Sequence, residues 1–162
     1  LNGFDEDLFM HQEEIDLCWR AHDLNNKVYY CHNSTVYHVG GGSLSYNNPV
    51  KSFYNHRNSL LLILKNMPYR NLIMALPIRI MIDYLIIFLL IIQSISNIFT
   101  LDWSKKKLQR AKCIIQAHWS FLFWTPKFLF KRKAIKKEKI LHKKMIMIEY
   151  YIKKRRKFYE LK

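Results

Sequence analysis

The sequence predicts an α/β region at the front of the chain, followed by a longer and mostly α-helical region that associates with a membrane. Apolar residues recur at helical spacing from about residue 12 to residue 22. Two β-rich runs follow, Val28–Cys31 and Thr35–His38. Residues 71–101 are the most apolar part of the chain and carry only two charges, Arg79 and Asp83. We therefore expect three regions, at residues 1–66, 67–130 and 131–162.

The first region is expected to begin with a turn capped by Asp5 and to continue into a helix at Gln12–His22. Acidic residues in the first turn of this helix suit the positive end of its dipole. The two predicted strands come next, and Gly40–Gly42 is expected to form a loop, because glycine tolerates the backbone angles that loops need. A second helix is predicted over Ser52–Asn66, ended by Met67 and Pro68.

The second region has the composition of a membrane-associated segment. From Tyr84 to Leu101 the chain carries no charge, which reaches the length of a membrane span, although Pro77 and the polar residues 93–97 weaken that interpretation. A further helix is predicted from Asp102 to about Trp119. The aromatic run at residues 119–124 continues this helix and is flanked by lysines. This composition is typical of segments that lie at a membrane interface.

Positive charge is concentrated in the last third of the chain. The net charge is +15, yet residues 1–66 hold seven acidic and five basic side chains, whereas residues 102–162 hold four and twenty. Such a basic region could face nucleic acid or an anionic membrane. The apolar run directly before it favours lipid, so we expect an anionic membrane surface and no nucleic acid as partner.

Cysteine usage and the first residue give two smaller expectations. Cys18, Cys31 and Cys113 form no CxxC pair and no zinc pattern, which favours free thiols in a reducing compartment. The sequence begins at Leu1 inside what reads as a running motif, with no basic and apolar leader. We therefore expect the N-terminal part of a longer protein to be missing.

The acidic pair Glu13–Glu14 is the first candidate for chemistry. A carboxylate at a helix start could remove a proton from an attacking hydroxyl. The competing interpretation is that both glutamates only complement the helix dipole, while Asp16 and Arg20 form a surface pair one turn apart. His38 is a second candidate, although a lone histidine at a strand end is more often structural. The glycine run alone is a weak signal.

Three stretches together resemble the C-terminal half of a family 2 glycosyltransferase, in particular bacterial rhamnosyltransferase-like members. They are Gly3–Glu6, Phe9–Arg20 and Val36–Leu44. In that family a Gly-Phe-Asp-Glu turn precedes a Glu-Asp pair, followed by Asp-Leu and Arg. Glu14 occupies the usual Asp position, so the resemblance implies Glu14 as general base and Glu13 as its neighbour and the next candidate.

The resemblance also implies a fold and a set of binding residues. The fold would be the C-terminal part of a GT-A (Rossmann-like) domain, with the nucleotide-binding half and its Asp-x-Asp motif missing and a few short strands retained. His38 would help to bind a divalent cation, Mg²⁺ or Mn²⁺, or the donor diphosphate. The substrate-binding residues would be Asp16, Arg20, Gly40, Gly41, Gly42 and Arg57. Arg57 is included because Asn55–Asn58 resembles the Asn-x-Arg-Asn segment of the family, and the competing interpretation is a surface arginine.

The function expected from this resemblance is inverting transfer of a sugar from a nucleotide-sugar donor to a lipid-linked or polysaccharide hydroxyl. Without the nucleotide-binding half, this chain should not transfer sugar unaided. Nucleotide sugars are cytoplasmic and the basic tail favours the same side, so peripheral or monotopic attachment at the cytoplasmic face of the cell membrane is expected. The alternative is a non-catalytic basic membrane-associated protein whose acidic front binds a partner.

Overall fold

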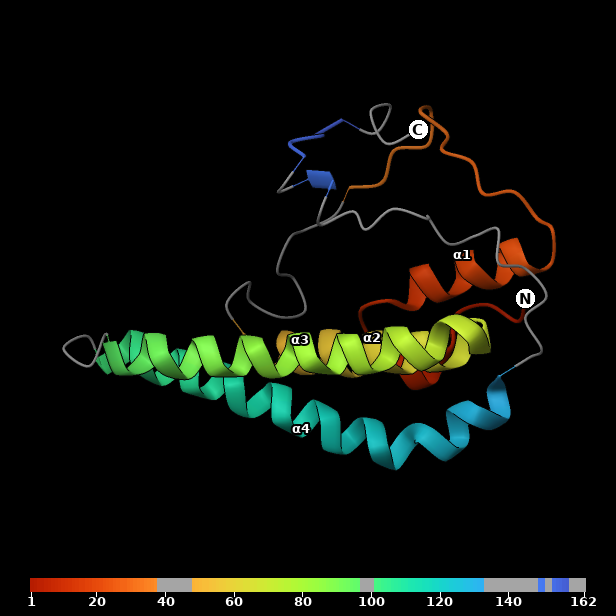
Figure 1. Ribbon diagram of the computed structural model, residues 1–162. Coiled ribbons are helices and arrows are strands. Elements are labelled where there is room, and N and C mark those ends of the chain that lie inside the picture. The colour runs from red at the N-terminus through yellow and green to blue at the C-terminus, as the bar shows by residue number, and fades with distance from the viewer. Residues whose placement is uncertain (38–47, 97–100, 133–148, 151–152, 158–162) are drawn as a thin grey trace.

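The computed structural model describes residues 1–37, 48–96, 101–132, 149–150 and 153–157. A 3-10 turn, η1 (Glu6–Leu8), precedes four α-helices (Figure 1). These are α1 (Glu13–Asp23), α2 (Val50–Asn66), α3 (Tyr69–Ser96) and α4 (Leu101–Lys131).

Three long helices form the body of the molecule. Met67 and Pro68 separate α2 from α3, and α4 returns along both of them, while α1 lies to one side of this layer and contacts α2 (Figure 1). The main core lies where η1, α2 and α4 meet, and a smaller core joins α3 to α4. The main core contains Leu8, Leu60, Leu61, Leu64, Phe121 and Phe128, and the smaller one Ile87, Ala111 and Ile114.

The predicted α/β fold is wrong. Val28–Cys31 and residues 35–37 adopt no strand, and no described residue belongs to a sheet. A strand is stable only when its backbone groups pair with a neighbour. Among the described residues these runs have no partner strand, and their side chains are exposed, with Tyr30 at 91% exposure and Tyr37 at 94%. The described part of the chain is therefore all-helical.

The helical predictions fared better. The helix expected at residues 12–22 is α1, and Asp5 caps η1 by accepting a hydrogen bond from the Asp7 amide. The second predicted helix is α2, and its C-cap is Met67, as expected. The third predicted helix continues through the aromatic run as a single helix, α4, with Pro126 inside it. All three cysteines are free.

Helix α3 is the one described helix that is long and apolar enough to cross a membrane. It contains 28 residues, or about 42 Å at 1.5 Å per residue, and Pro77 does not end it. Three parts of the predicted organisation lie outside the described residues: His38, the loop Gly40–Gly42 and most of the basic tail after Arg132.

Candidate functional site

The loop that leads into α1 has an unusual backbone. Phe9, His11 and Gln12 all have positive φ angles, of 62°, 64° and 74°. Residues other than glycine rarely adopt this left-handed backbone conformation. Each one lowers the stability of the fold by on the order of 1–3 kcal/mol, so it persists only where the surrounding structure enforces it. The strained segment ends directly at Glu13, the first residue of α1.

Asn58 of α2 holds this loop in place through its side chain. Its side-chain amide lies 2.8 Å from the Leu8 carbonyl, 2.7 Å from that of Met10 and 2.9 Å from that of His11. The two N–H groups of this amide are shared among the three carbonyl oxygens, and Asn58 is completely buried. One side chain thereby fixes the course of the strained loop.

Arg57, the residue before Asn58 on α2, holds the end of η1 directly before this loop. Its guanidinium donates to the carbonyls of Asp7 and Leu8, each at 3.1 Å, and to Asn58 Oδ1 at 2.8 Å. The rings of Phe53, Tyr54 and Trp124 surround it, at 5.0–5.9 Å from its central carbon. Burial lowers the pKa of Arg57, although an arginine stays charged at neutral pH. The structure thus places this predicted substrate-binding residue in a clamp on the chain's own backbone.

We expect Asn58→Ala to lower the free energy of unfolding by about 2–3 kcal/mol, because the carbonyls of Met10 and His11 lose the side-chain donor that satisfies them. Asn55→Ala is the matched control, since Asn55 lies on the same helix and is exposed; its effect should stay within about 0.5 kcal/mol. Urea unfolding of the detergent-solubilised chain measures both. Equal effects of the two substitutions would show that the Asn58 amide does not hold the loop.

Asp16 joins α1 to α2. Its carboxylate is completely buried and accepts hydrogen bonds from Lys65 at 2.9 Å and Asn66 at 2.8 Å, both from the end of α2. Arg20 approaches from one turn along α1, at 2.7 Å, and also donates to the carbonyls of Leu1 and Gly3. The predicted Asp16–Arg20 pair exists, but it is anchored in the interior and ties the first residues of the chain to both helices.

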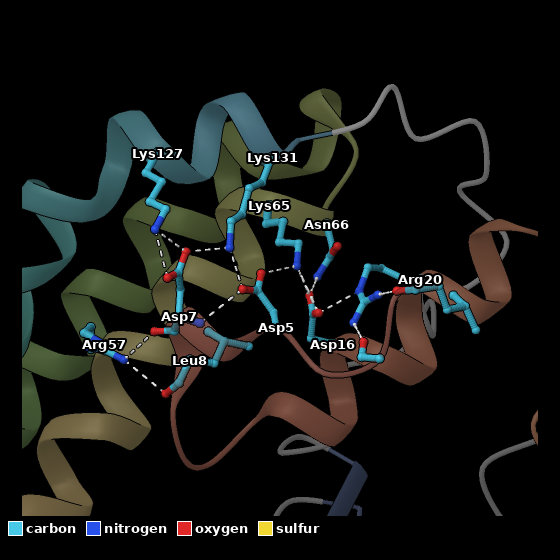
Figure 2. A network of polar contacts seen from close by, with 12 residues as sticks. Asp5, Asp7, Leu8, Asp16, Arg20, Arg57, Lys65, Asn66, Lys127 and Lys131 are labelled. Carbon is cyan, nitrogen blue, oxygen red and sulfur yellow. Dashed lines mark hydrogen bonds and ion pairs between the residues drawn. The ribbon is translucent and has the colours of Figure 1, made fainter.

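Asp5 and Asp7 extend this network toward α4. Figure 2 shows the two carboxylates between lysines of α2 and α4, with Asp5 contacting Lys65 and Lys131, and Asp7 contacting Lys127 and Lys131. Burial alone would raise the pKa of each carboxyl group, but the hydrogen bonds and charges of the lysines more than offset it. The pKa of both aspartates therefore lies below the usual value. Both remain ionised at neutral pH and hold η1 against α4.

Glu13 and Glu14 differ from these other acidic residues. Glu14 is exposed and has no hydrogen bond or ion pair with any described residue. The Oε2 atom of Glu13 and the Nε2 atom of the nearby His11 are buried without a hydrogen-bond partner in the described part of the chain. Both carboxylates lie in the first turn of α1. The acidic pair therefore follows a loop that other residues hold in place, and neither glutamate has a hydrogen-bond or ion-pair partner among the described residues.

The remaining predicted binding residues cannot be placed relative to the acidic pair. His38 and Gly40–Gly42 lie outside them. Within the described ranges no group of three histidine, cysteine, aspartate or glutamate side chains could hold a metal ion.

A second polar cluster lies deep in the helical layer and was not predicted from the sequence, although its members Arg79 and Asp83 stand out as the only charges of residues 71–101. Asp83 of α3 is completely buried, and its carboxylate contacts His56 of α2 at 2.7 Å and His118 of α4 at 3.0 Å. Arg79, one turn earlier on α3, contacts the same carboxylate. The partners lie 27 and 35 residues from Asp83 in the sequence, so no local pattern could indicate them.

Comparison with known proteins adds no assignment to this site. No protein-family model matches the chain, and neither the curated proteins nor the solved structures searched contain a match.

Proposed function

We propose that this chain is the acceptor-side, C-terminal part of an inverting family 2 glycosyltransferase. The enzyme would move a sugar from a nucleotide-sugar donor to a hydroxyl of a lipid-linked or polysaccharide acceptor. The proposal rests on the resemblance of residues 3–6, 9–20 and 36–44 and on one structural observation. Neither glutamate of the acidic pair has a partner among the described residues, whereas Asp5, Asp16 and Arg20 of the motif hold η1 and α1 in place.

This division of roles is the main support for the proposal. Backbone strain persists where the surrounding structure enforces it, and such places are often functional sites. Here Asn58 holds the strained loop, Arg57 holds the end of η1 directly before it, and Asp16 holds the first turns of α1. A general base must be held in a fixed position and must be free to accept a proton. The loop fixes the start of α1, and the two glutamates that follow it have no partner in the described part of the chain.

The proposed reaction needs one proton transfer from this chain. The Glu14 carboxylate accepts the proton of the acceptor hydroxyl, and the hydroxyl oxygen attacks the anomeric carbon from the side opposite the leaving nucleoside diphosphate. The bond to the diphosphate breaks as the new glycosidic bond forms, so the anomeric configuration inverts. The proposal keeps a divalent cation as cofactor on the ground of the resemblance alone.

The proposal places the protein at the cytoplasmic face of the cell membrane, with peripheral or monotopic attachment. Two observations support a membrane location. Helix α3 is long and apolar enough for lipid, and the chain after Asp102 is strongly basic. Anionic lipids of the cytoplasmic leaflet attract such basic segments.

A transfer assay with the full-length enzyme tests the proposal. Membranes containing it are incubated with labelled nucleotide sugars and lipid-linked acceptors, and the new linkage is analysed by NMR. We expect transfer with inversion at the anomeric carbon. Retention of configuration, or no transfer from any nucleotide sugar, would overturn the proposal and favour the non-catalytic alternative.

A further inference from the structure

Helix α3 has two different sides. The inward side follows a heptad-like spacing and packs against α2 and α4. It consists of Leu72, Leu76, Ile80, Asp83, Ile87, Leu90 and Ser94. Between Ile73 and Ile95 the outward side, which we call the apolar strip, is exposed and holds no charged side chain. It consists of Ile73, Met74, Ile78, Met81, Ile82, Leu85, Phe88, Leu89, Ile92 and Ile95.

The size of the apolar strip calls for a partner. It runs from Ile73 to Ile95, or about 33 Å at 1.5 Å per residue, and Leu85 and Phe88 are 55% and 58% exposed. Soluble monomers rarely leave an apolar surface of this length open to water. Both charges of this part of α3, Arg79 and Asp83, are turned into the buried cluster instead.

The beginning of α4 carries bases at the same level as the second half of α3. Ser94 of α3 hydrogen-bonds Ser104 of α4 at 2.6 Å, and Ile87 packs against Ala111 and Ile114. The stretch of α4 between these contacts therefore runs beside residues 87–94. Its exposed side chains include Lys105, Lys106, Arg110 and Lys112.

We propose that the apolar strip of α3 lies flat in the surface of an anionic membrane, with the bases of α4 at the level of the lipid headgroups. The bases indicate the partner, because positive side chains beside an apolar face match an anionic lipid surface. A second copy of the chain would instead bring these bases close to one another. The inference names the surface behind the attachment proposed above, yet it stands on α3 and α4 alone and not on glycosyl transfer.

The same geometry argues against a crossing by α3. If α3 spanned the bilayer, residues 87–94 would lie in the hydrocarbon, and α4 would carry its bases to the same depth. Charged side chains at that depth are strongly unfavourable. The shared carboxylate of Asp83 fastens α3 to both α2 and α4, so α3 cannot separate from α4 without breaking the buried cluster.

Flotation with vesicles of phosphatidylcholine and phosphatidylglycerol tests the surface, using the full chain. We expect the double variant Leu85→Lys/Phe88→Lys to lower the partition coefficient at least tenfold. Gln109→Lys/Gln116→Lys adds the same charge at exposed positions of α4 and should leave binding unchanged or stronger. Circular dichroism verifies that both variants keep their helices. Equal binding of the two double variants would overturn the proposal.

Depth measurements separate an in-plane helix from a span. Spin labels are placed singly at Ile78→Cys, Leu85→Cys and Ile92→Cys, with the native cysteines replaced. An in-plane helix puts all three labels at one shallow depth, whereas a span separates them by roughly 10 Å steps along the bilayer normal. A stepped depth profile, or a dimer that forms without vesicles and does not bind them, would overturn the proposal. Neither measurement involves a nucleotide sugar, so a failed transfer assay leaves this result independent.

Discussion

Glu14→Gln is expected to reduce sugar transfer by the full-length enzyme by roughly 10²–10⁴-fold, the range typical of losing a general base. The amide has nearly the same shape as the carboxylate but cannot accept the hydroxyl proton. Glu14 is exposed and bonds to no described residue, so the fold does not depend on it. The free energy of unfolding should therefore change by no more than about 0.5 kcal/mol. Initial rates at saturating donor and acceptor, with urea unfolding in parallel, measure both quantities.

Glu13→Gln is the matched control, because it removes the neighbouring carboxylate from the same turn of α1. We expect a smaller loss of transfer, since one Glu13 carboxylate oxygen is buried and points away from solvent. If Glu13→Gln abolished transfer and Glu14→Gln did not, the base would be Glu13. If neither variant lost transfer, the acidic pair would have only the dipole role that helix starts commonly give to glutamates.

The helices could be predicted from the sequence because their signals are local. Ile15, Cys18, Trp19 and His22 recur at helical spacing, and Met67–Pro68 ends α2, so α1 and α2 were found nearly to the residue. The strand predictions failed because a strand depends on a partner as well as on its own residues. Val28–Cys31 has β-forming side chains, but the described chain gives it no neighbouring strand.

The position of the candidate site stays a prediction from the sequence, and the contacts of its members became known only from the structure. The sequence pointed to Glu13, Glu14, Asp16, Arg20 and Arg57. It could not show that Asp16 bonds to residues 49 and 50 positions away, or that Arg57 reaches carbonyls about 50 positions away. Long-range pairing of this kind depends on the packing of α1 and η1 on α2, which no spacing in one sequence encodes.

Support for the acidic pair and support for the helical layer come from different residues. The clamp of Arg57 and Asn58 acts on the loop before α1, whereas the cluster around Asp83 joins α2, α3 and α4. The two sets meet on α2, where His56 of the cluster directly precedes Arg57 in the sequence. We therefore expect substitutions in one set to affect the other as well, because neighbouring residues couple energetically. Disruption of the Asp83 cluster should act on the whole layer, including the apolar strip.

Asp83→Ala is expected to lower the free energy of unfolding by about 3–5 kcal/mol, as when one partner of a buried ion pair is removed. The Asp83 carboxylate is completely buried and serves three partners, so Arg79 would keep a charge without its counter-charge and His56 and His118 would lose their shared acceptor. Leu85→Ala, two residues along the same helix and 55% exposed, is the control and should cost within about 0.5 kcal/mol. Replacing Asp83 and Arg79 together by leucine should recover part of the loss, because apolar replacement of both members of a buried pair is often neutral. Urea unfolding in detergent, followed by circular dichroism, measures all three variants. A loss for Asp83→Ala no larger than that of Leu85→Ala would mean that the cluster does not hold the three helices together.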